Sequence, residues 1–449
     1  MTQRTLHIIG LVLLTLTGSA RPVAAQSAAY DALEAAYAPY MDRDDPLSFA
    51  MKIQSISQGP YKFWRGGKDL FYRWARTAAA DWLADPSSYV VAHGDLHFGN
   101  IGTYAADPDW GQLSFGMVDL DDSAFMPFQI ELLGGMVTLE LTALDNDVQL
   151  SDRQRRELLA TLLESYRQAA ASPAGAAQWL RNSPRVRALL AASGRDYERE
   201  LATYVENGQF RTVIRSKSGQ VKEILRPVGQ KLDAIRAALA DATQRSQRLR
   251  SLLGDRHEAP RRIKVAVLRT RLGSSGSQGL SKYLVLAGPV NGMPHDLILY
   301  LKREIPAAAE RSGAIVPEPM DGGARLVRHL AMLSEVQPWL STWCRIGDES
   351  YWLTFKEPWS QEVDPGDFAD LESLAEAARL WGWVAGAAHG RQNGDIAERI
   401  TGELEVQLAA RSAAYVARLM SEFAEFRADA RTAAQIERAQ RALAALTAP

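Results

Sequence analysis

The spacing of apolar residues switches along this chain between a helical period and a period of two, and no other feature constrains the fold more. Residues 28–88 and 128–250 carry apolar side chains at helical spacing. After Pro260 the spacing becomes two, and from Asp367 to the end it is helical again. Because helices and strands are segregated rather than alternating, the sequence predicts an α+β protein with a β-rich segment between helical ones.

Alternating apolar residues define the β-rich segment. They occur in three runs, which we predict as strands over 263–268, 282–286 and 297–301. Asn291-Gly292 favours a tight hairpin turn between the last two of these strands. A helix over 324–334 and a second hairpin over 342–355 should follow.

Two shorter strands are predicted nearer the N-terminus, at 89–92 and 113–118, where apolar runs flank polar loops that contain glycine. Ser151 and Gln154 form a capping-box pattern at the start of a later helix. Arg, Gln and Ala dominate residues 229–253, for which we predict a long exposed helix.

The composition excludes several classes of protein. The 449 residues include 51 Lys+Arg and 53 Asp+Glu, so the net charge is -2 and no strongly basic surface is offered to nucleic acid. A hydrophobic content of 47% excludes general disorder. Cys344 is the only cysteine, which excludes an internal disulfide framework and a cysteine-rich metal site.

Residues 1–25 have the parts of a secretory signal peptide. Arg4 gives a positive start, Leu6–Leu16 is too short to span a bilayer, and small residues end at Ala25. We expect cleavage after Ala25 and a periplasmic or secreted protein without a stable membrane anchor, because no cysteine for lipid attachment stands near that site. The alternative is an ordinary amphipathic N-terminal helix.

The densest polar cluster is the run His93-Gly94-Asp95-Leu96-His97-Phe98-Gly99-Asn100, followed by Asp119-Leu120-Asp121-Asp122. Carboxylate and amide oxygens are the ligands that Mg²⁺ prefers, together with phosphate oxygens. In phosphoryl transfer an Asp orients the accepting hydroxyl, while an Asn five residues later and an Asp on the next strand hold the metal. Asp95, Asn100 and Asp119 fit these positions, with Asp121 as a further metal ligand.

Two other interpretations of this cluster remain open. His and Asp beside Gly often build only a hydrogen-bonded turn. His93, Asp95 and His97 could instead hold zinc in a metal-dependent hydrolase. No second pair of histidines with ligand spacing accompanies them, which weighs against zinc.

The run from His93 to Asn100, followed by a strand and Asp119, resembles the catalytic loop of aminoglycoside and choline kinases in the protein-kinase-like superfamily. Residues 45–395 are similar to bacterial domain-of-unknown-function family 2252, placed in that superfamily, through several motifs: Phe63-Trp64-Arg65-Gly66, Gly94–Gly102, Asp119–Asp122, the strand with Lys302, Trp381-Gly382-Trp383 and Ala388-His389. The resemblance implies that Asp95 is the catalytic aspartate and that Asn100 and Asp119 are metal ligands. His93 and His97 would shape the catalytic loop.

A glycine- and serine-rich loop lies between the first two strands of the β-rich segment. Its backbone N–H groups could approach nucleotide phosphates, and Lys302 on the third strand could neutralise phosphate charge. The residues assigned to this binding role are Gly273, Ser274, Ser275, Gly276, Gly279 and Lys302.

Two departures from ordinary kinases are visible. Asp95 precedes Lys302, whereas the lysine strand normally comes first, so the order is permuted, as it is in the resembling family. The helix expected to give Lys302 an acidic partner begins Gly322-Gly323-Ala324-Arg325, without an acid. Residues that could substitute are Glu304, Glu318, Asp321 and Glu335.

The predicted architecture is therefore a kinase-like, two-lobed α+β fold with permuted order, in which the helical catalytic lobe comes first and a small antiparallel β-sheet lobe later. Its segments are a signal peptide over 1–25, the catalytic-loop part of the helical lobe over 26–150, a helical insertion over 151–259, a β-rich nucleotide-binding-type lobe over 260–365, and C-terminal helices of the helical lobe over 366–449.

The predicted function is transfer of a phosphoryl or nucleotidyl group from a Mg²⁺-bound ATP or other nucleotide to a hydroxyl acceptor. Arg65 could contact phosphate or hold two elements together, Glu131 should brace the catalytic loop, and His389 should pack at a helix end. Export conflicts with ATP, which is scarce outside the cytoplasm. A secreted pseudokinase-like binding protein without catalysis is therefore the main alternative, ahead of the hydrolase.

Overall fold

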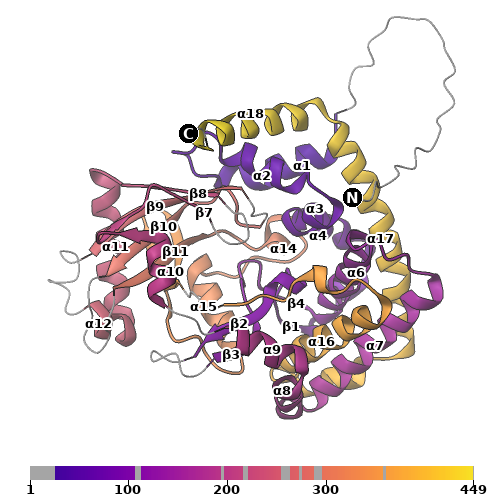
Figure 1. Ribbon diagram of the computed structural model, residues 1–449. Coiled ribbons are helices and arrows are strands. Elements are labelled where there is room, and N and C mark those ends of the chain that lie inside the picture. The colour runs from indigo at the N-terminus through magenta and orange to yellow at the C-terminus, as the bar shows by residue number, and fades with distance from the viewer. Residues whose placement is uncertain are drawn as a thin grey trace, which may run out of the picture.

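The computed structural model describes residues 26–106, 113–193, 197–215, 221–253, 263–272, 276–287, 296–356 and 360–447. The predicted signal peptide, the Asn291-Gly292 turn and Gly273–Ser275 lie outside these ranges. The protein is a mixed α+β structure, mostly helical, with a seven-stranded antiparallel sheet. We call residues 197–356 the sheet part, and residues 26–193 with 360–447 the helical part (Figure 1).

The large sheet has the strand order β12-β13-β11-β10-β9-β8-β7. Its strands are β7 (Val213–Arg215), β8 (Val221–Leu225), β9 (Ile263–Leu272), β10 (Lys282–Ala287), β11 (Leu297–Glu304), β12 (Ser341–Ile346) and β13 (Glu349–Phe355). The three predicted strands of the β-rich segment and the later hairpin of β12 and β13 are confirmed.

The sheet begins earlier in the chain than predicted. Strands β7 and β8 lie inside the segment 151–259, which we expected to be a helical insertion, and β8 pairs with β9. The segment 229–253 is also not one exposed helix, because it forms α11 (Gln230–Arg245) and α12 (Gln247–Leu253). Ile235 and Leu239 stand one helical turn apart and bury this face of α11 against the sheet.

Helices make up most of the helical part. Its first segment holds α1 (Ala28–Tyr37), α2 (Ser48–Ile56), α3 (Pro60–Gly66), α4 (Lys68–Ala78), α5 (Ala80–Leu83), α6 (Phe128–Asp145), α7 (Asp152–Ala171), α8 (Pro173–Asn182) and α9 (Pro184–Ala192). The capping box of Ser151 and Gln154 at α7 is confirmed. After the sheet part come α16 (Leu371–Gly390), α17 (Gly402–Ala428) and α18 (Ala430–Thr447).

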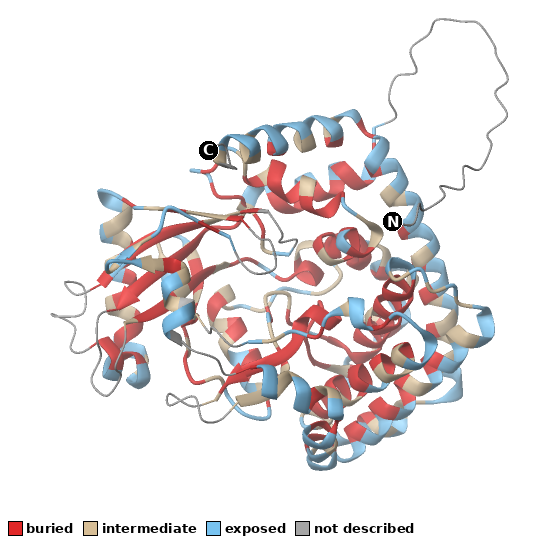
Figure 2. Ribbon diagram, viewed as in Figure 1, coloured by how far each residue is buried: buried red, intermediate tan, exposed pale blue. Residues whose placement is uncertain are grey.

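The first described helices and the last helices of the chain pack together, at the top of Figure 1. The Ser27 backbone N–H donates to the Asp429 carboxylate at 2.8 Å, across 402 residues of sequence. Arg431 pairs with both Asp429 and Asp31. The red interior and pale blue outer faces of these helices in Figure 2 show one-sided burial. The helical part is therefore closed by both ends of the described chain.

Two small sheets carry the polar loops. Strand β1 (Tyr89–Ala92) pairs with β4 (Ala124–Pro127), and β2 (Ile101–Ala105) pairs with β3 (Leu113–Met117), both antiparallel. The polar loop 93–100 therefore connects β1 to β2, and the acidic turn 119–122 connects β3 to β4. Two helices of the sheet part, α14 (Ala308–Arg311) and α15 (Gly322–Leu333), face this region. None of the described helices is long and apolar enough to cross a membrane.

Candidate active site

The loop 93–100 is held by its backbone. The two carboxylate oxygens of Glu131 accept the N–H of His93 at 2.5 Å and that of Gly94 at 3.0 Å. The Tyr72 hydroxyl donates to the Gly94 carbonyl at 2.7 Å, and Trp381 Nε1 donates to the Leu96 carbonyl at 2.9 Å. All of these groups come from the helical part, so the predicted bracing role of Glu131 agrees with the geometry.

His389 contacts Glu131, the residue that braces the loop. It is fully buried, its Nδ1 lies 2.7 Å from the Tyr166 hydroxyl, and its Nε2 lies 3.4 Å from the Glu131 carboxylate. Burial raises the pKa of Glu131, but the neighbouring His389 and the loop N–H groups more than offset this and hold it below the usual value. His389 packs as expected and also orients the brace.

Asp95 lies at the centre of the loop beside a lysine. Its Oδ1 is 2.9 Å from the Nζ of Lys68, whose ammonium stands 3.2 Å above the ring centre of Trp64. Burial raises the pKa of Asp95 to about 6, and Lys68 limits the rise. Asp95 is thus a carboxylate that accepts a proton more readily than an exposed one.

The rings of the two loop histidines, His93 and His97, form hydrogen bonds within the site. His93 Nδ1 accepts the N–H of Asp95 at 3.2 Å, and its Nε2 lies 2.9 Å from the Val118 carbonyl. His97 Nε2 accepts from Arg65 Nε at 2.9 Å, and burial together with Arg65 lowers the pKa of His97 well below its usual value. Both rings support the loop, and Arg65 holds His97.

Asn100 links the loop to the acidic turn. Its Nδ2 donates to the Asp95 carbonyl at 2.9 Å, and its own carbonyl accepts the N–H of Val118 at 2.9 Å. The second bond continues the pairing of β2 with β3 by one step. Asn100 therefore lies directly across from the residue before Asp119.

The acidic turn departs from ordinary backbone geometry at Asp119, which has a φ of 59°. It touches the loop at Gly94, where φ is 78° and a Cβ would lie 1.9 Å from the Asp122 carbonyl oxygen. Only glycine fits at this contact. Loop and turn therefore pack edge to edge at this point.

Lys302 reaches the acidic turn from β11. Its Nζ forms ion pairs with the carboxylates of Asp119 and Asp121, although 183 residues separate it from Asp119. Burial would lower the pKa of Lys302, but these two carboxylates raise it well above its usual value. The acidic partners that the sequence left unassigned are thus the residues of the turn itself.

The carboxyl groups around Lys302 differ in the direction of their pKa shifts. Desolvation by the surrounding protein raises the pKa of Asp119, but Lys302 more than offsets this and lowers it overall. Burial and the charge of Asp119 raise the pKa of Asp121 to about 6. Burial raises the pKa of Glu304 well above its usual value, and neither of its oxygens has a hydrogen-bond partner among the described residues.

The turn fits a hard divalent cation in one respect. Asp119 and Asp121 already point their carboxylates at one cation, the Lys302 ammonium, and the buried Oδ1 of Asp121 has no partner in the described chain. Across the described ranges, no three His, Cys, Asp or Glu side chains gather as a metal site. A Mg²⁺ ion here would take two carboxylates, the Asn100 amide, and oxygens from ligand or water.

Helix α15 holds the turn with an arginine instead of presenting an acid to Lys302. Arg325 is buried and donates to the backbone carbonyls of Ser123, Asp121 at 2.7 Å, and Ile305 at 3.0 Å. Where an acidic partner for Lys302 was expected, α15 carries Arg325, which donates hydrogen bonds to the backbone of the acidic turn.

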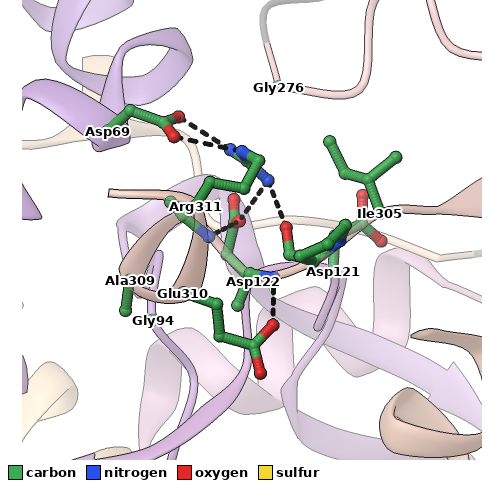
Figure 3. Close-up of polar contacts among 12 residues, drawn as sticks. Asp69, Gly94, Asp121, Asp122, Gly276, Ile305, Ala309, Glu310 and Arg311 are labelled. Atoms are coloured by element: carbon green, nitrogen blue, oxygen red, sulfur yellow. Dashed lines mark hydrogen bonds and ion pairs between the residues drawn. The ribbon is translucent and has the colours of Figure 1, made fainter. Parts of the chain in front are cut away.

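Arg311 of α14 connects the two parts of the protein (Figure 3). It donates to both carboxylate oxygens of Asp69 in α4, at 3.0 and 2.7 Å, and lies 3.6 Å from Asp122. The Asp122 carboxylate also accepts the N–H of Ala308 at 2.7 Å. These contacts fix the segment after β11 against both the acidic turn and the helical part.

The described half of the glycine-rich loop packs against the helical part. The Gly276 carbonyl accepts from the buried Lys52 Nζ at 2.7 Å, and the Gly279 carbonyl accepts the N–H of Asp42 at 2.8 Å. Gly279 has a φ of 88°, and a Cβ there would lie 2.4 Å from Met41 Sδ. The structure does not bring Gly276 or Gly279 into contact with Lys302, and Gly273, Ser274 and Ser275 fall outside the described ranges.

A pocket of about 170 Å³ opens beside Asp119, between the sheet part and the helical part. Residues from both parts line it, among them Thr103, Met117, Asp119, Tyr300, Trp352 and Lys356. Asp119 is 48% exposed, so its carboxylate can reach a ligand in this pocket.

Sequence reasoning missed the basic residues of the site: Lys52, Lys68, Lys282, Arg311 and Arg325. The first three are buried lysines. One signal was available, since Lys52 stands between Met51 and Ile53 in an apolar helical run, where a lysine needs a specific reason.

Fold and site define a mixed α+β protein with carboxylates and lysines gathered between a helical part and an antiparallel sheet. The sequence profile of DUF2252, described as an uncharacterized protein conserved in bacteria, matches residues 43–434, so the chain belongs to this family. No curated protein and no solved structure matches the chain.

Proposed function

We propose that this protein is a kinase-like phosphotransferase that moves a phosphoryl or nucleotidyl group from a Mg²⁺-nucleotide to a hydroxyl acceptor. The observation that carries the proposal is the meeting of Lys302 with Asp119 and Asp121, beside Asp95 and Asn100. Phosphoryl transfer needs a carboxylate for the acceptor, oxygen ligands for metal, and a cation for phosphate.

The order of elements in the sheet part supports the same proposal, because in protein kinases too a glycine-rich loop precedes a strand that carries the phosphate-binding lysine. The glycine-rich loop joins β9 to β10, Lys302 lies on β11, and α15 precedes the β12–β13 hairpin. The chain then returns to the helical part, where the Gln361 carbonyl accepts the N–H of Thr103 at 2.9 Å. The pocket beside Asp119 lies at this return and is mainly apolar, as suits a nucleotide base.

Each site residue has a distinct role under this proposal. Asp95 orients the acceptor hydroxyl and takes its proton, for which a raised pKa suits it. Asn100, Asp119 and Asp121 would hold Mg²⁺, which neutralises phosphate charge when bound. Lys302 would then exchange its carboxylate partners for phosphate oxygens.

A second candidate is a pseudokinase-like protein that binds a ligand in the cleft without catalysis. The specific observation in its favour is that a lysine pairs with each key carboxylate: Lys68 with Asp95, and Lys302 with Asp119. A zinc hydrolase is less well supported, because one ring nitrogen of His97 and both of His93 already have hydrogen-bond partners.

The protein with residues 1–25 removed is the material for the test. Nucleotides with Mg²⁺ should raise its melting temperature by mass action, and Asp119→Asn should abolish the Mg²⁺-dependent part of the shift. Asp147→Asn is the matched control, since Asp147 also has a positive φ, of 60°, and is exposed. No Mg²⁺-dependent shift with any nucleotide at millimolar concentration would refute the proposal.

Turnover separates the enzyme from the pseudokinase. Asp95→Asn should keep nucleotide binding but reduce transfer to hydroxyl compounds by at least about 100-fold. Binding without turnover in the unmodified protein, across a broad panel of acceptors, would favour the second candidate.

We also propose that the protein is exported and cleaved after Ala25, on the basis of the signal-peptide pattern. N-terminal sequencing of protein recovered from the periplasm should begin at Gln26. Recovery of the full chain from the cytoplasm alone would contradict export and remove the conflict with ATP.

A further inference from the structure

A second lysine lies next to Lys302 in the large sheet. Lys282 of β10 is the direct antiparallel partner of Lys302 in β11, so the two side chains leave the same face of the sheet. Both are buried, with exposed fractions of 5% and 4%. Side chains at such paired positions are about 5 Å apart at their Cβ atoms.

Lys282 lacks the partners that Lys302 has. Within the described part of the chain, its ammonium has neither a hydrogen bond nor an ion pair, whereas Lys302 holds both Asp119 and Asp121. Burial and then the charge of Lys302 lower the pKa of Lys282 to about 8. A buried cation next to another cation is costly unless an anion joins it.

Two further lysines lie near this pair. Lys222 of β8 is close enough to Lys356 and Lys282 that burial and these charges lower its pKa. Lys356 lines the pocket beside Asp119. On the acidic side, Asp119 and Asp121 pair with Lys302. Burial raises the pKa values of Glu304 and Glu362.

We propose that Lys282 is a second phosphate-binding residue, which together with Lys302 holds two linked phosphate groups of the donor. This inference rests on the proposed function and deepens it. Neighbouring ammonium groups on adjacent strands suit a chain of phosphates better than a single phosphate, because each can take oxygens of a different group. The pair therefore selects for phosphate number and is indifferent to the base.

Binding measurements on the protein without residues 1–25 test this. Dissociation constants for ATP, ADP, AMP, pyrophosphate and orthophosphate are measured by calorimetry, with Mg²⁺, for the unmodified protein and Lys282→Met. The variant should bind ATP, ADP and pyrophosphate at least about tenfold more weakly, and AMP within about twofold. Lys282→Arg, which keeps the charge, should recover most of the affinity.

The matched control is Lys264→Met, which removes the same charge from an exposed position on the adjacent strand β9 and should leave all affinities unchanged. Lys282→Met should fold, because it removes an unpaired buried charge, and a melting temperature at or above that of the unmodified protein verifies this.

The outcomes separate this inference from the proposed function. If ATP binds with Mg²⁺ and Lys282→Met leaves the ratio of ATP to AMP affinity unchanged, the role of Lys282 is refuted while the proposed function stands. If pyrophosphate binds through Lys282 but no nucleotide does, Lys282 is a phosphate-binding residue and the donor is not a nucleotide. The nucleotide proposal is then wrong. If neither binds, both are wrong.

Discussion

The two segments of the site, the polar loop 93–100 and the acidic turn 119–122, touch each other but are held from opposite sides. The loop is bonded to the helical part through Glu131, Tyr72 and Trp381. The turn is bonded to the sheet part, through ion pairs to Lys302 and through carbonyls that accept from Arg325. A shift of the sheet part would therefore pull on Asp119 and Asp121, whereas Asn100 would stay with Asp95 in the loop.

We expect the largest effect from a substitution at Gly94, where the loop contacts the turn. Gly94→Ala puts a Cβ 1.9 Å from the Asp122 carbonyl at a φ of 78°, and should destabilise the protein by at least about 3 kcal/mol in urea unfolding. Gly402→Ala is the control, because nothing lies within 4 Å of a Cβ there, and it should change stability by less than about 1 kcal/mol. Equal stability of the two variants would show that the loop and turn do not pack closely at Gly94.

Removing the lysine from the sheet side should loosen only the turn. Lys302→Met leaves Asp119 and Asp121 facing each other without a cation, at a cost of about 2–4 kcal/mol at pH 7.5. Hydrogen exchange should become faster in the segment 119–122 and stay unchanged in 93–97. Faster exchange in both segments would contradict separate support.

Weakening the Glu131 brace should loosen the loop 93–100 and leave the turn 119–122 in place. Glu131→Gln keeps one acceptor oxygen but turns an amide group toward a loop N–H, which costs about 1–3 kcal/mol. Exchange at the His93 and Gly94 amides should quicken, and the turn should be unaffected. A variant with unchanged exchange at His93 would show that Glu131 is not the brace.

The contact of the glycine-rich loop with the helical part should depend on pH through Lys52. Burial and the nearby Arg311 lower the pKa of Lys52 from 10.5 to about 7. Between pH 7 and 10 the unfolded chain therefore binds more protons at this residue, so its contribution to stability rises with pH. Relative to Lys52→Met, the unmodified protein should gain about 1–3 kcal/mol from pH 7 to pH 9.5 in urea unfolding. A constant difference would mean that Lys52 titrates normally.

The sequence predicted the parts of the site that are local. Asp95 and Asn100 share one loop, and Asp119 follows the hairpin of β2 and β3 that begins at the end of this loop, so residues that are near in sequence also lie near one another. The sequence did not reveal Lys68, Lys282 or Arg325, because which lysines and arginines are buried depends on packing between distant segments.

The fold shows the same division between local and distant information. The central strands were predicted from their alternation, whereas β8 was missed. Val221, Ile224 and Leu225 are spaced three and four residues apart, which is also the spacing of a helical face. Pairing with β9, and not the local pattern, makes this segment a strand.

The bond from Trp381 to the Leu96 carbonyl also has a consequence for the time at which the protein becomes complete. The two residues are separated by 285 positions, so at about 5–20 residues per second Trp381 is synthesised roughly 15–60 s after the loop. A nascent or truncated chain that ends before α16 carries every proposed catalytic and metal residue and keeps Glu131 and Tyr72, but it lacks the bond from Trp381 to the loop. The loop therefore gains its full set of hydrogen bonds only after α16 has been synthesised.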